Sequence, residues 1–590
     1  MEVAAPQHGE RPSSVAAPAA VPVRRAAILV ASGALVVLVF IAYRAALDNG
    51  FVWDDHGYLE FNPALKTFSA LRSAFGMDAN QGPNPLMPLS YNYRPVTFAS
   101  LYLNALLLGP SARSFHLGNL VLHAALALVL LVFLRQRLGA PTPWALAAAF
   151  VATCWWALHP EHVETVAWAS GRYDLLGTLL CAIALTFQVR RGRGAVAIQG
   201  ALIFLAVMAK ESFTPMFAIL MVDDWASGSL NRQAIPKYTF LGAVFLLWQW
   251  LRFRVGSGSL TIAMLTRPVF KLSLDYLSAI GIYSWRALSP LPLSLAHTYR
   301  PVPPGIALLV LAVLGVVLLA VWRNRRWMAP AATFILMLGA VALTLRPAGM
   351  SAERYFYGPS IGLVWLLALG LRKAGESEKP ALRYVAMGAI IGVTILNGAS
   401  VVRRTREWES DATVFSEELG NGVDDWLGQQ HMAVIEAGLG NFQSALSRIE
   451  TARRHALQAE ATPTAFAQVL SIDAMIHLRM GDPRTALDRL HAAIQLVPAF
   501  PSLHLEAAMA YSALGDEEHE SGELEEALRL SPDFAEARIA LGRLKRSRRD
   551  LEGARRELAR VPPSATGAPG VAKALKDAID ELEKDGKPLR

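Results

Sequence analysis

Two adjacent carboxylates follow a long apolar run near the start of the chain. The run covers residues 26–46, and Asp54 and Asp55 lie shortly after it. About 20 apolar residues in a helix, rising 1.5 Å per residue, cross the hydrocarbon layer of a bilayer. A carboxylate at this boundary could act as a general base that deprotonates a hydroxyl at the membrane surface. The alternative is that the pair only solvates a helix end.

Four further groups of ionisable residues stand at the ends of apolar runs. They are His159-Pro160-Glu161-His162-Val163-Glu164, Arg172-Tyr173-Asp174, Lys210-Glu211 and Glu353-Arg354. Ionisable residues next to a membrane are costly unless they are solvated, paired or used in function. Each group could therefore belong to one polar site or be a structural feature.

The histidine-rich group, His159 to Glu164, has three interpretations. It could line an active site, cap a helix that starts after Pro160, or bind a metal ion. The spacing His-x-x-His-x-Glu offers three ligands but differs from the zincin pattern, so a divalent metal is not favoured.

The cationic groups have functional and structural interpretations. Arg172 with Asp174, and Lys210 with Glu211, could simply neutralise each other. Lys210 could instead face a lipid phosphate. Arg354 suits such a phosphate, because a planar guanidinium can donate two parallel hydrogen bonds to it. The alternative is that Arg354 pairs with Glu353 or extends to the membrane interface.

Composition divides the chain into an apolar part and a charged part. Of the 590 residues, 53% are hydrophobic and 18% are charged, and the mean hydropathy is +0.32. Apolar runs occupy the chain up to residue 402, and charge and Ala dominate residues 403–590. These features predict a polytopic membrane domain followed by a soluble domain. The net charge of +8 is dispersed over short loops, so no nucleic-acid partner is expected.

Basic residues at the ends of the apolar runs predict the membrane topology. Because Lys and Arg favour cytoplasmic loops, Arg24 and Arg25 place the N-terminus in the cytoplasm. The same rule predicts 11 spans: 26–46, 116–134, 143–158, 166–189, 195–209, 213–225, 238–251, 305–322, 328–345, 358–371 and 383–402. The ionisable groups and the C-terminal domain then share the extracytoplasmic side. Residues 94–109 are expected to lie on the outer leaflet, and whether 94–109 or 272–289 crosses is left open.

The C-terminal domain shows a repeat. Gly440-Asn441, Gly481-Asp482, Gly515-Asp516 and Arg549-Asp550 mark helix turns spaced by 41, 34 and 34 residues. Small residues recur around them at Ala445, Ala486, Ala554, Ala452, Ala493 and Ala527, and Glu520 breaks the pattern. A 34-residue period with small residues between paired helices is typical of tetratricopeptide (TPR) repeats, which bind partner segments in a groove. A packing appendage is the alternative.

The ordered motifs together resemble a known family. They are Trp53-Asp54-Asp55, Tyr93-Arg94-Pro95, Phe115-His116 through Asn119 to His123, the stretch from Leu158 to Trp168, Ser170-Gly171-Arg172 with Asp174, Lys210-Glu211 and Ala352-Glu353-Arg354-Tyr355, followed by the repeats. This set resembles the transmembrane-and-TPR O-mannosyltransferases, relatives of the protein O-mannosyltransferases in the GT-C superfamily. The chain departs from the family in having about four repeats, where members often have more.

The resemblance implies an all-α fold, a GT-C membrane bundle followed by a TPR-type α-solenoid. The expected domains are a disordered tail (1–23), the transmembrane GT-C domain (24–402), a connector (403–425), TPR-like repeats (426–566) and a C-terminal helix or tail (567–590). The basic, Ala- and Arg-rich composition suggests a bacterial inner membrane, with the repeats in the periplasm.

The family also implies a reaction and residue roles. A mannose-like sugar moves from a polyprenyl-phosphate donor to a hydroxyl, expected to be Ser or Thr of a protein held by the TPR groove. Asp54 is the expected base and Asp55 orients the acceptor, by an inverting single displacement. Arg354, Lys210, Arg94 and Glu353 are expected to bind the donor phosphate and sugar, and His159, Glu161, His162, Glu164, Arg172, Asp174 and Glu211 to form the wall of the site. No cofactor is required. The alternatives are a glycolipid-modifying GT-C enzyme and a non-catalytic TPR scaffold in the membrane.

Overall fold

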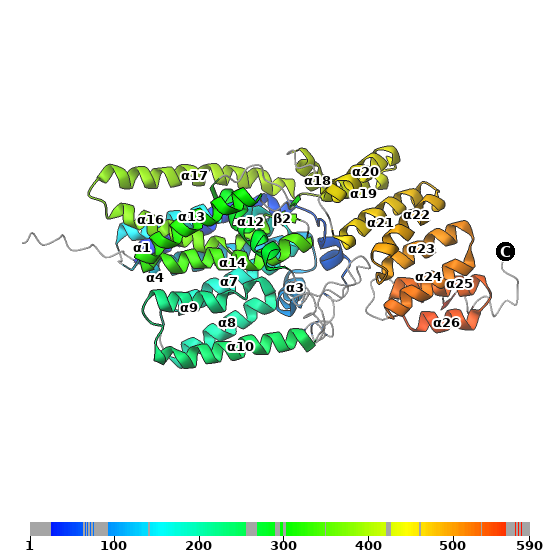
Figure 1. The fold of residues 1–590 in the computed structure, drawn as a ribbon, viewed down its shortest axis with the longest axis horizontal. Coiled ribbons are helices and arrows are strands. Elements are labelled where there is room, and N and C mark those ends of the chain that lie inside the picture. Colours follow the sequence, from blue (N-terminus) through cyan, green and yellow to red (C-terminus); the bar gives the residue numbers. More distant parts are fainter. Residues whose placement is uncertain are drawn as a thin grey trace, which may run out of the picture.

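The chain folds into a helical membrane bundle and a helical repeat array, which lie at opposite ends of the molecule (Figure 1). The computed structural model describes residues 25–62, 93–139, 142–190, 192–254, 268–288, 296–298, 303–348, 350–420, 426–458, 462–532 and 534–561, with single residues between 63 and 92 and between 571 and 580. The predicted tails, 1–23 and 567–590, lie outside the described residues apart from those single positions.

The membrane bundle, residues 25–407, consists of helices that run along a common direction (Figure 1). They are α1 (Arg25–Ala42), α3 (Pro95–Leu108), α4 (Ala112–Leu138), α5 (Pro143–Ala157), α7 (Arg172–Phe187), α8 (Arg193–Ala209), α9 (Met216–Ala226), α10 (Ile235–Arg254), α12 (Val269–Leu288), α13 (Pro304–Arg323), α14 (Met328–Ala348), α16 (Ser360–Gly375) and α17 (Pro380–Glu407). A helix occupies each of the 11 segments predicted to cross the membrane. Long helices suit this setting, because they satisfy their own backbone hydrogen bonds in lipid.

Four helices within the described residues are long and apolar enough to cross a membrane by length and composition. They are Arg25–Ala42, Ala112–Leu138, Arg325–Leu343 and Pro380–Glu407. Pro95–Leu108, Pro143–Ala157, Arg193–Ala209 and Gly305–Val316 are apolar but shorter. Spanning by the remaining helices, and so the total of 11, stays a prediction.

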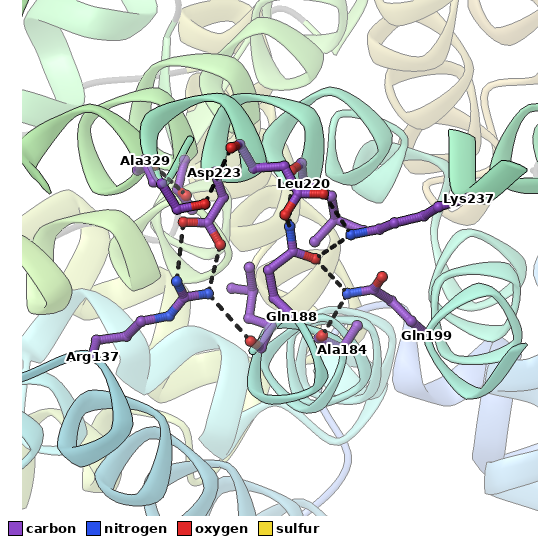
Figure 2. A network of polar contacts seen from close by, with 12 residues as sticks. Arg137, Ala184, Gln188, Gln199, Leu220, Asp223, Lys237 and Ala329 are labelled. Atoms are coloured by element: carbon purple, nitrogen blue, oxygen red, sulfur yellow. Dashed lines mark hydrogen bonds and ion pairs between the residues drawn. The ribbon is translucent and has the colours of Figure 1, made fainter. Parts of the chain in front are cut away.

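A polar network joins the bundle helices at the end that carries the C-terminus of α4. Figure 2 shows Arg137 of α4 pointing at Asp223 of α9, with N···O distances of 2.6 and 3.0 Å. On its other side Lys237 of α10 binds Gln188, which in turn accepts from Gln199 of α8 at 2.8 Å. Buried charges are tolerated here because Arg137 pairs with Asp223 and Lys237 pairs with Asp224.

One short ladder is an exception to the predicted all-α fold. Strand β1 (Ala296–Thr298) pairs with β2 (Met350–Ala352) in antiparallel register, Ala296 opposite Ala352. The backbone of these two loops needs hydrogen-bond partners where no helix supplies them. Because β2 runs directly into Glu353 and Arg354, the ladder also fixes the start of that motif.

The repeat array, residues 426–561, consists of four helix pairs. These are α19 (Trp426–Gly438) with α20 (Phe442–Gln458), α21 (Pro463–Arg479) with α22 (Pro483–Leu496), α23 (Pro501–Leu514) with α24 (Glu517–Leu530), and α25 (Ala535–Ser547) with α26 (Leu551–Ala559). The predicted small residues at the helix contacts, Ala445, Ala486, Ala554, Ala452, Ala493 and Ala527, are all fully buried. The predicted TPR-like solenoid is confirmed.

The predicted turns between paired helices share one geometry. Gly440, Gly481, Gly515 and Arg549 have positive φ angles of 83°, 80°, 74° and 61°. A residue in this left-handed conformation ends a helix, and glycine adopts it without steric cost. The Asp that follows in three of the turns then caps the next helix; Asp482, for example, accepts from the backbone N of Thr485 at 3.2 Å. The Gly-Asp dipeptide therefore ends one helix and starts the next.

The array is packed onto the bundle at its first repeat. The connector helix α18 (Asp411–Gly420) joins α17 to α19. A single apolar cluster runs from the bundle through Trp408 and Phe415 to Trp426 and Ala433. Figure 1 shows α18, α19 and α20 beside the end of α17, with the blue N-terminal segment next to them.

Candidate active site around the acidic loop

The acidic loop, residues 49–60, follows a short helical turn, Arg44–Asp48, and ends in another, His56–Glu60. Asp55 is fully buried. Its carboxylate accepts hydrogen bonds from the backbone N of Ser170 at 2.7 Å and of Val52 at 3.2 Å. Asp55 therefore holds the loop to the chain before α7 and is not free to contact an acceptor.

Asp54 differs from its neighbour in both exposure and bonding. Its side chain is half-buried, and no hydrogen bond to its carboxylate comes from the described residues. Burial raises the pKa of Asp54 to about 6, and the nearby Arg354 limits the rise. Burial also raises the pKa of Asp55, to about 7, against its hydrogen bonds to Ser170 and Val52. A carboxylate that is accessible, unbonded and more basic than usual has the properties of a general base.

Trp53, directly before Asp54, has a strained backbone. Its φ angle is +55°, a conformation that costs a residue with a side chain roughly 1–2 kcal/mol. Its ring stacks on Trp168 with centroids 5.3 Å apart. Such strain persists only where the surroundings hold it, and it often marks functional positions.

Arg354 begins a short helix, α15 (Arg354–Tyr357), beside the acidic loop. Its guanidinium lies over the rings of Trp53 and Trp168, 5.4 Å from each centroid. It forms an ion pair with Glu164 through Nη1. Its Nε and Nη2 have no hydrogen-bond partner among the described residues. Arg354 therefore keeps guanidinium donors that an anion could use.

The two other predicted donor-binding cations are already paired. Lys210 donates to both carboxylate oxygens of Asp174, at 2.7 and 2.8 Å. Arg94 donates to both oxygens of Glu211, at 2.7 and 3.1 Å. Burial alone would raise the pKa of Glu211, but Arg94 more than offsets this and holds it at about 2. The pairs suggested within each motif, Arg172 with Asp174 and Lys210 with Glu211, are not the pairs that form.

Arg172 ties helices together instead. It donates to Asn119 Oδ1 at 2.5 Å, to Asn104 Oδ1 at 3.0 Å and to the backbone O of Phe115 at 2.9 Å. Gly171 beside it has no room for a side chain, because a Cβ would lie 2.4 Å from the backbone O of Thr165. Arg172 therefore links α7 to α3 and α4.

The histidine-rich group is fully buried behind Arg354. Besides Glu164, which binds Arg354, it contains Glu161, whose carboxylate lies 3.6 Å from Arg286 of α12. His162 Nε2 is 3.2 Å from Ser360 Oγ. His159 Nδ1 accepts from the backbone N of Glu161 at 3.3 Å. Glu164 is the member of this group that binds Arg354, whereas Glu161 and His162 contact residues of α12 and α16.

Glu353 lies with this buried charge cluster and not against the acidic loop. It binds Arg404 of α17 at 2.6 Å. Burial raises the pKa of Glu353, and Arg404 opposes the rise. Within the described part of the chain, no group of three or more His, Cys, Asp or Glu side chains is placed to hold a metal ion.

Three curated relatives show what the chain is similar to. Human protein O-mannosyl-transferase TMTC3 is 24% identical over 469 residues, which is 70% of this chain and 50% of the human protein. Drosophila melanogaster Tmtc3 is 22% identical, covering 70% of this chain and 54% of that one. Mouse TMTC1 is 30% identical over 35% of this chain and 24% of its own length. The chain resembles the TMTC protein O-mannosyl-transferases.

This TMTC-like chain spans about half the length of the curated relatives it matches most extensively. No protein-family model matches it. Among solved structures, the Cut9–Hcn1 complex and yeast Tom70 are found at 13% identity, with TM-scores of 0.27 and 0.21 over 82% and 74% of this chain. Scores this low do not establish a shared fold.

The TMTC-like motifs converge on one side of the bundle, but further residues complete the site. Asp411 and His431, from the connector helix and the first repeat, contact the acidic loop. Neither Asp411 nor His431 belongs to a motif named from the sequence. The only local sequence feature is the helix start at Ser410-Asp411, which does not indicate a contact with the acidic loop. Their role depends on a contact between segments more than 350 residues apart.

Proposed function

We propose that this chain is a membrane-bound glycosyltransferase that moves a mannose-like sugar from a polyprenyl-phosphate donor to a Ser or Thr hydroxyl of a protein. The observation that carries the proposal is the carboxylate of Asp54, which is accessible, unbonded among the described residues, and close to the charge of Arg354. The motif order and the similarity to protein O-mannosyl-transferases support the same reaction class.

The reaction is a single displacement. The acceptor oxygen attacks the anomeric carbon, the bond from that carbon to the phosphate oxygen breaks, and the phosphate leaves with the electron pair. Asp54 takes the hydroxyl proton as the new bond forms, and the configuration at carbon inverts. The unpaired donors of Arg354 suit the departing phosphate, because preorganised charge stabilises the transition state. The site lies on the extracytoplasmic face in the proposed topology.

The repeat array favours a protein acceptor over a glycolipid. A TPR-type solenoid offers a long concave surface of the kind that binds extended peptide segments. A lipid acceptor would reach the acidic loop through the bilayer and would gain nothing from this array.

The test is Asp54→Asn, which keeps the size of the side chain but cannot accept the proton. With polyprenyl-phosphate mannose and a Ser/Thr-rich protein acceptor, kcat should fall roughly 10²–10⁴-fold while the donor KM changes little. Asp48→Asn is the matched control, because Asp48 is an exposed carboxylate just before the acidic loop, 3.3 Å from Arg113. It should transfer sugar like wild type.

Other outcomes would redirect the proposal. Wild-type turnover by Asp54→Asn would show that Asp54 is not the base. Transfer to a glycolipid but not to protein would favour the lipid-modifying enzyme. No transfer by wild type to either acceptor, with intact folding, would favour a scaffold.

A further inference from the structure

The acidic loop is held by the chain segment that leads into the repeats. Asn49 Nδ2 donates to the backbone O of Thr405 at 2.9 Å, and Gly50 N donates to the backbone O of Glu409 at 3.0 Å. A Cβ on Gly50 would lie 3.2 Å from that oxygen, a tight contact that would push the two segments slightly apart. The acidic loop is thus hydrogen-bonded to the segment that leads into the repeats.

Asp411, the first residue of α18, makes polar contacts with the residues that flank the Asp54–Asp55 pair. Its Oδ1 accepts from the backbone N of Trp53 at 2.7 Å, and its Oδ2 lies 3.0 Å from His56 Nε2. One carboxylate therefore binds the residues on both sides of the Asp54–Asp55 pair. His56 also contacts Glu60 at 2.5 Å through its other ring nitrogen.

The side chain of Trp53 is held by the first repeat. Its ring meets His431 of α19 edge-on, with centroids 6.4 Å apart. His431 in turn stacks on Phe415 of the connector helix, 4.3 Å apart and nearly parallel at 7°. The connector helix thus binds the backbone of Trp53, and the first repeat contacts its ring.

We propose that Asp411 is a positioning residue that holds Trp53 in its left-handed conformation and thereby aims the carboxylate of Asp54 at the reacting hydroxyl. The φ angle of Trp53 decides the direction of the chain at Asp54, so a relaxed Trp53 would turn the base away from Arg354. The contact also couples the repeat array to the site, because a shift of α18 and α19 moves Trp53. This inference rests on the proposed function, in which Asp54 is the base.

The kinetic test compares two changes of Asp411 with a matched control. Asp411→Ala removes both contacts, and Asp411→Asn keeps an acceptor for Trp53 but loses the charge facing His56. Glu409→Gln is the control, because the side chain of Glu409 is exposed and only its backbone touches the loop. We expect Asp411→Ala to lower kcat at least about 10-fold with donor KM unchanged, Asp411→Asn to lower it less, and Glu409→Gln to match wild type.

A double variant separates positioning from general destabilisation. If Asp411 acts through Asp54, adding Asp411→Ala to Asp54→Asn should leave the residual rate unchanged. A further drop of the same size as in wild type would overturn the proposal. So would wild-type kinetics in both Asp411 variants.

Hydrogen exchange on the full-length protein tests the contact without any activity. Asp411→Ala should speed exchange in residues 49–60 and leave the later repeats unchanged, whereas Glu409→Gln should change neither. Unchanged exchange in the loop would overturn the positioning role even if Asp54 is the base. Faster exchange together with a fully active Asp54→Asn would instead refute the proposed function while the contact itself stood. If Asp411→Ala fails to fold, Asp411→Asn and His56→Gln carry the same comparison.

Discussion

Lys210 donates hydrogen bonds to both carboxylate oxygens of Asp174, at 2.7 and 2.8 Å, and not to Glu211, its neighbour in the chain. Arg94 binds Glu211 instead. Lys210 Nζ and Arg94 Cζ lie 4.7 and 4.8 Å, respectively, from the ring centre of Tyr173. A donor phosphate that used either cation would have to displace a carboxylate. Arg354 binds Glu164 through Nη1, and its Nε and Nη2 have no partner in the part of the chain that the structure describes, so these two nitrogens need no such exchange.

The Lys210–Asp174 pair should therefore matter first for stability. Both side chains are buried, so removing one partner leaves an uncompensated charge, which costs roughly 3–5 kcal/mol. The single variant Asp174→Asn should lower the midpoint of thermal unfolding in detergent more than the double variant Lys210→Met/Asp174→Leu does. Equal losses in the single and double variants would show that the pair is not coupled.

The pH dependence of transfer should report the ionisation of Asp54. The base works only when deprotonated, and burial raises its pKa to about 6. The ratio kcat/KM should therefore be constant above about pH 7 and fall below about pH 6, roughly tenfold for each further unit. A fall in kcat/KM that began only near the ordinary pKa of an exposed aspartate would contradict the half-buried environment of Asp54.

The His56 contacts predict a loss of stability at alkaline pH. The hydrogen bond to Asp411 raises the pKa of His56 to about 9, against burial and with help from Glu60. A histidine with a raised folded pKa contributes its full stabilisation below its unfolded pKa of about 6.5 and loses it as the pH rises through about 9. Between these values the thermal midpoint of wild type should fall more steeply than that of His56→Gln. Parallel slopes would show that the ion pair adds nothing.

The repeat turns predict opposite effects for two glycine substitutions. Gly481 has a φ angle of 80° with nothing within 4 Å of a Cβ, so Gly481→Ala should cost about 1–2 kcal/mol from backbone strain alone. Gly522 lies inside α24, also with open space around it, and Gly522→Ala should stabilise by about 0.5–1 kcal/mol. Unfolding midpoints of the full-length chain would show both. A stabilising Gly481→Ala would contradict the turn geometry.

The membrane topology can be checked with two reporter fusions. Gly375 ends α16 and Gly440 lies in the first repeat turn, with the single long apolar helix α17 between them. Because one crossing separates them, reporters at the two sites should be found on opposite sides of the membrane. If both reporters were found on the same side, α17 would not cross the membrane and the predicted odd number of crossings would be wrong.

The sequence by itself determined the elements that depend on neighbouring residues. Apolar runs predicted each bundle helix, because a segment in lipid must close its own hydrogen bonds. The recurring dipeptides, two of them Gly-Asp, predicted the repeat turns, since glycine ends one helix and aspartate caps the next. The small residues of the repeat were also predictable, because they recur at a fixed period on one face of each helix.

Only the tertiary structure decided which charges pair. Lys210 and Glu211 are adjacent in sequence, yet their partners are Asp174 and Arg94, because side chains on neighbouring positions point in different directions. The role of Asp411 was equally hidden, since its partner His56 lies 355 residues earlier. Asp54 and Asp55 looked equivalent as a dipeptide. Packing against Ser170 buried one carboxylate and left the other accessible, because burial and hydrogen-bond partners come from distant segments that no local pattern encodes.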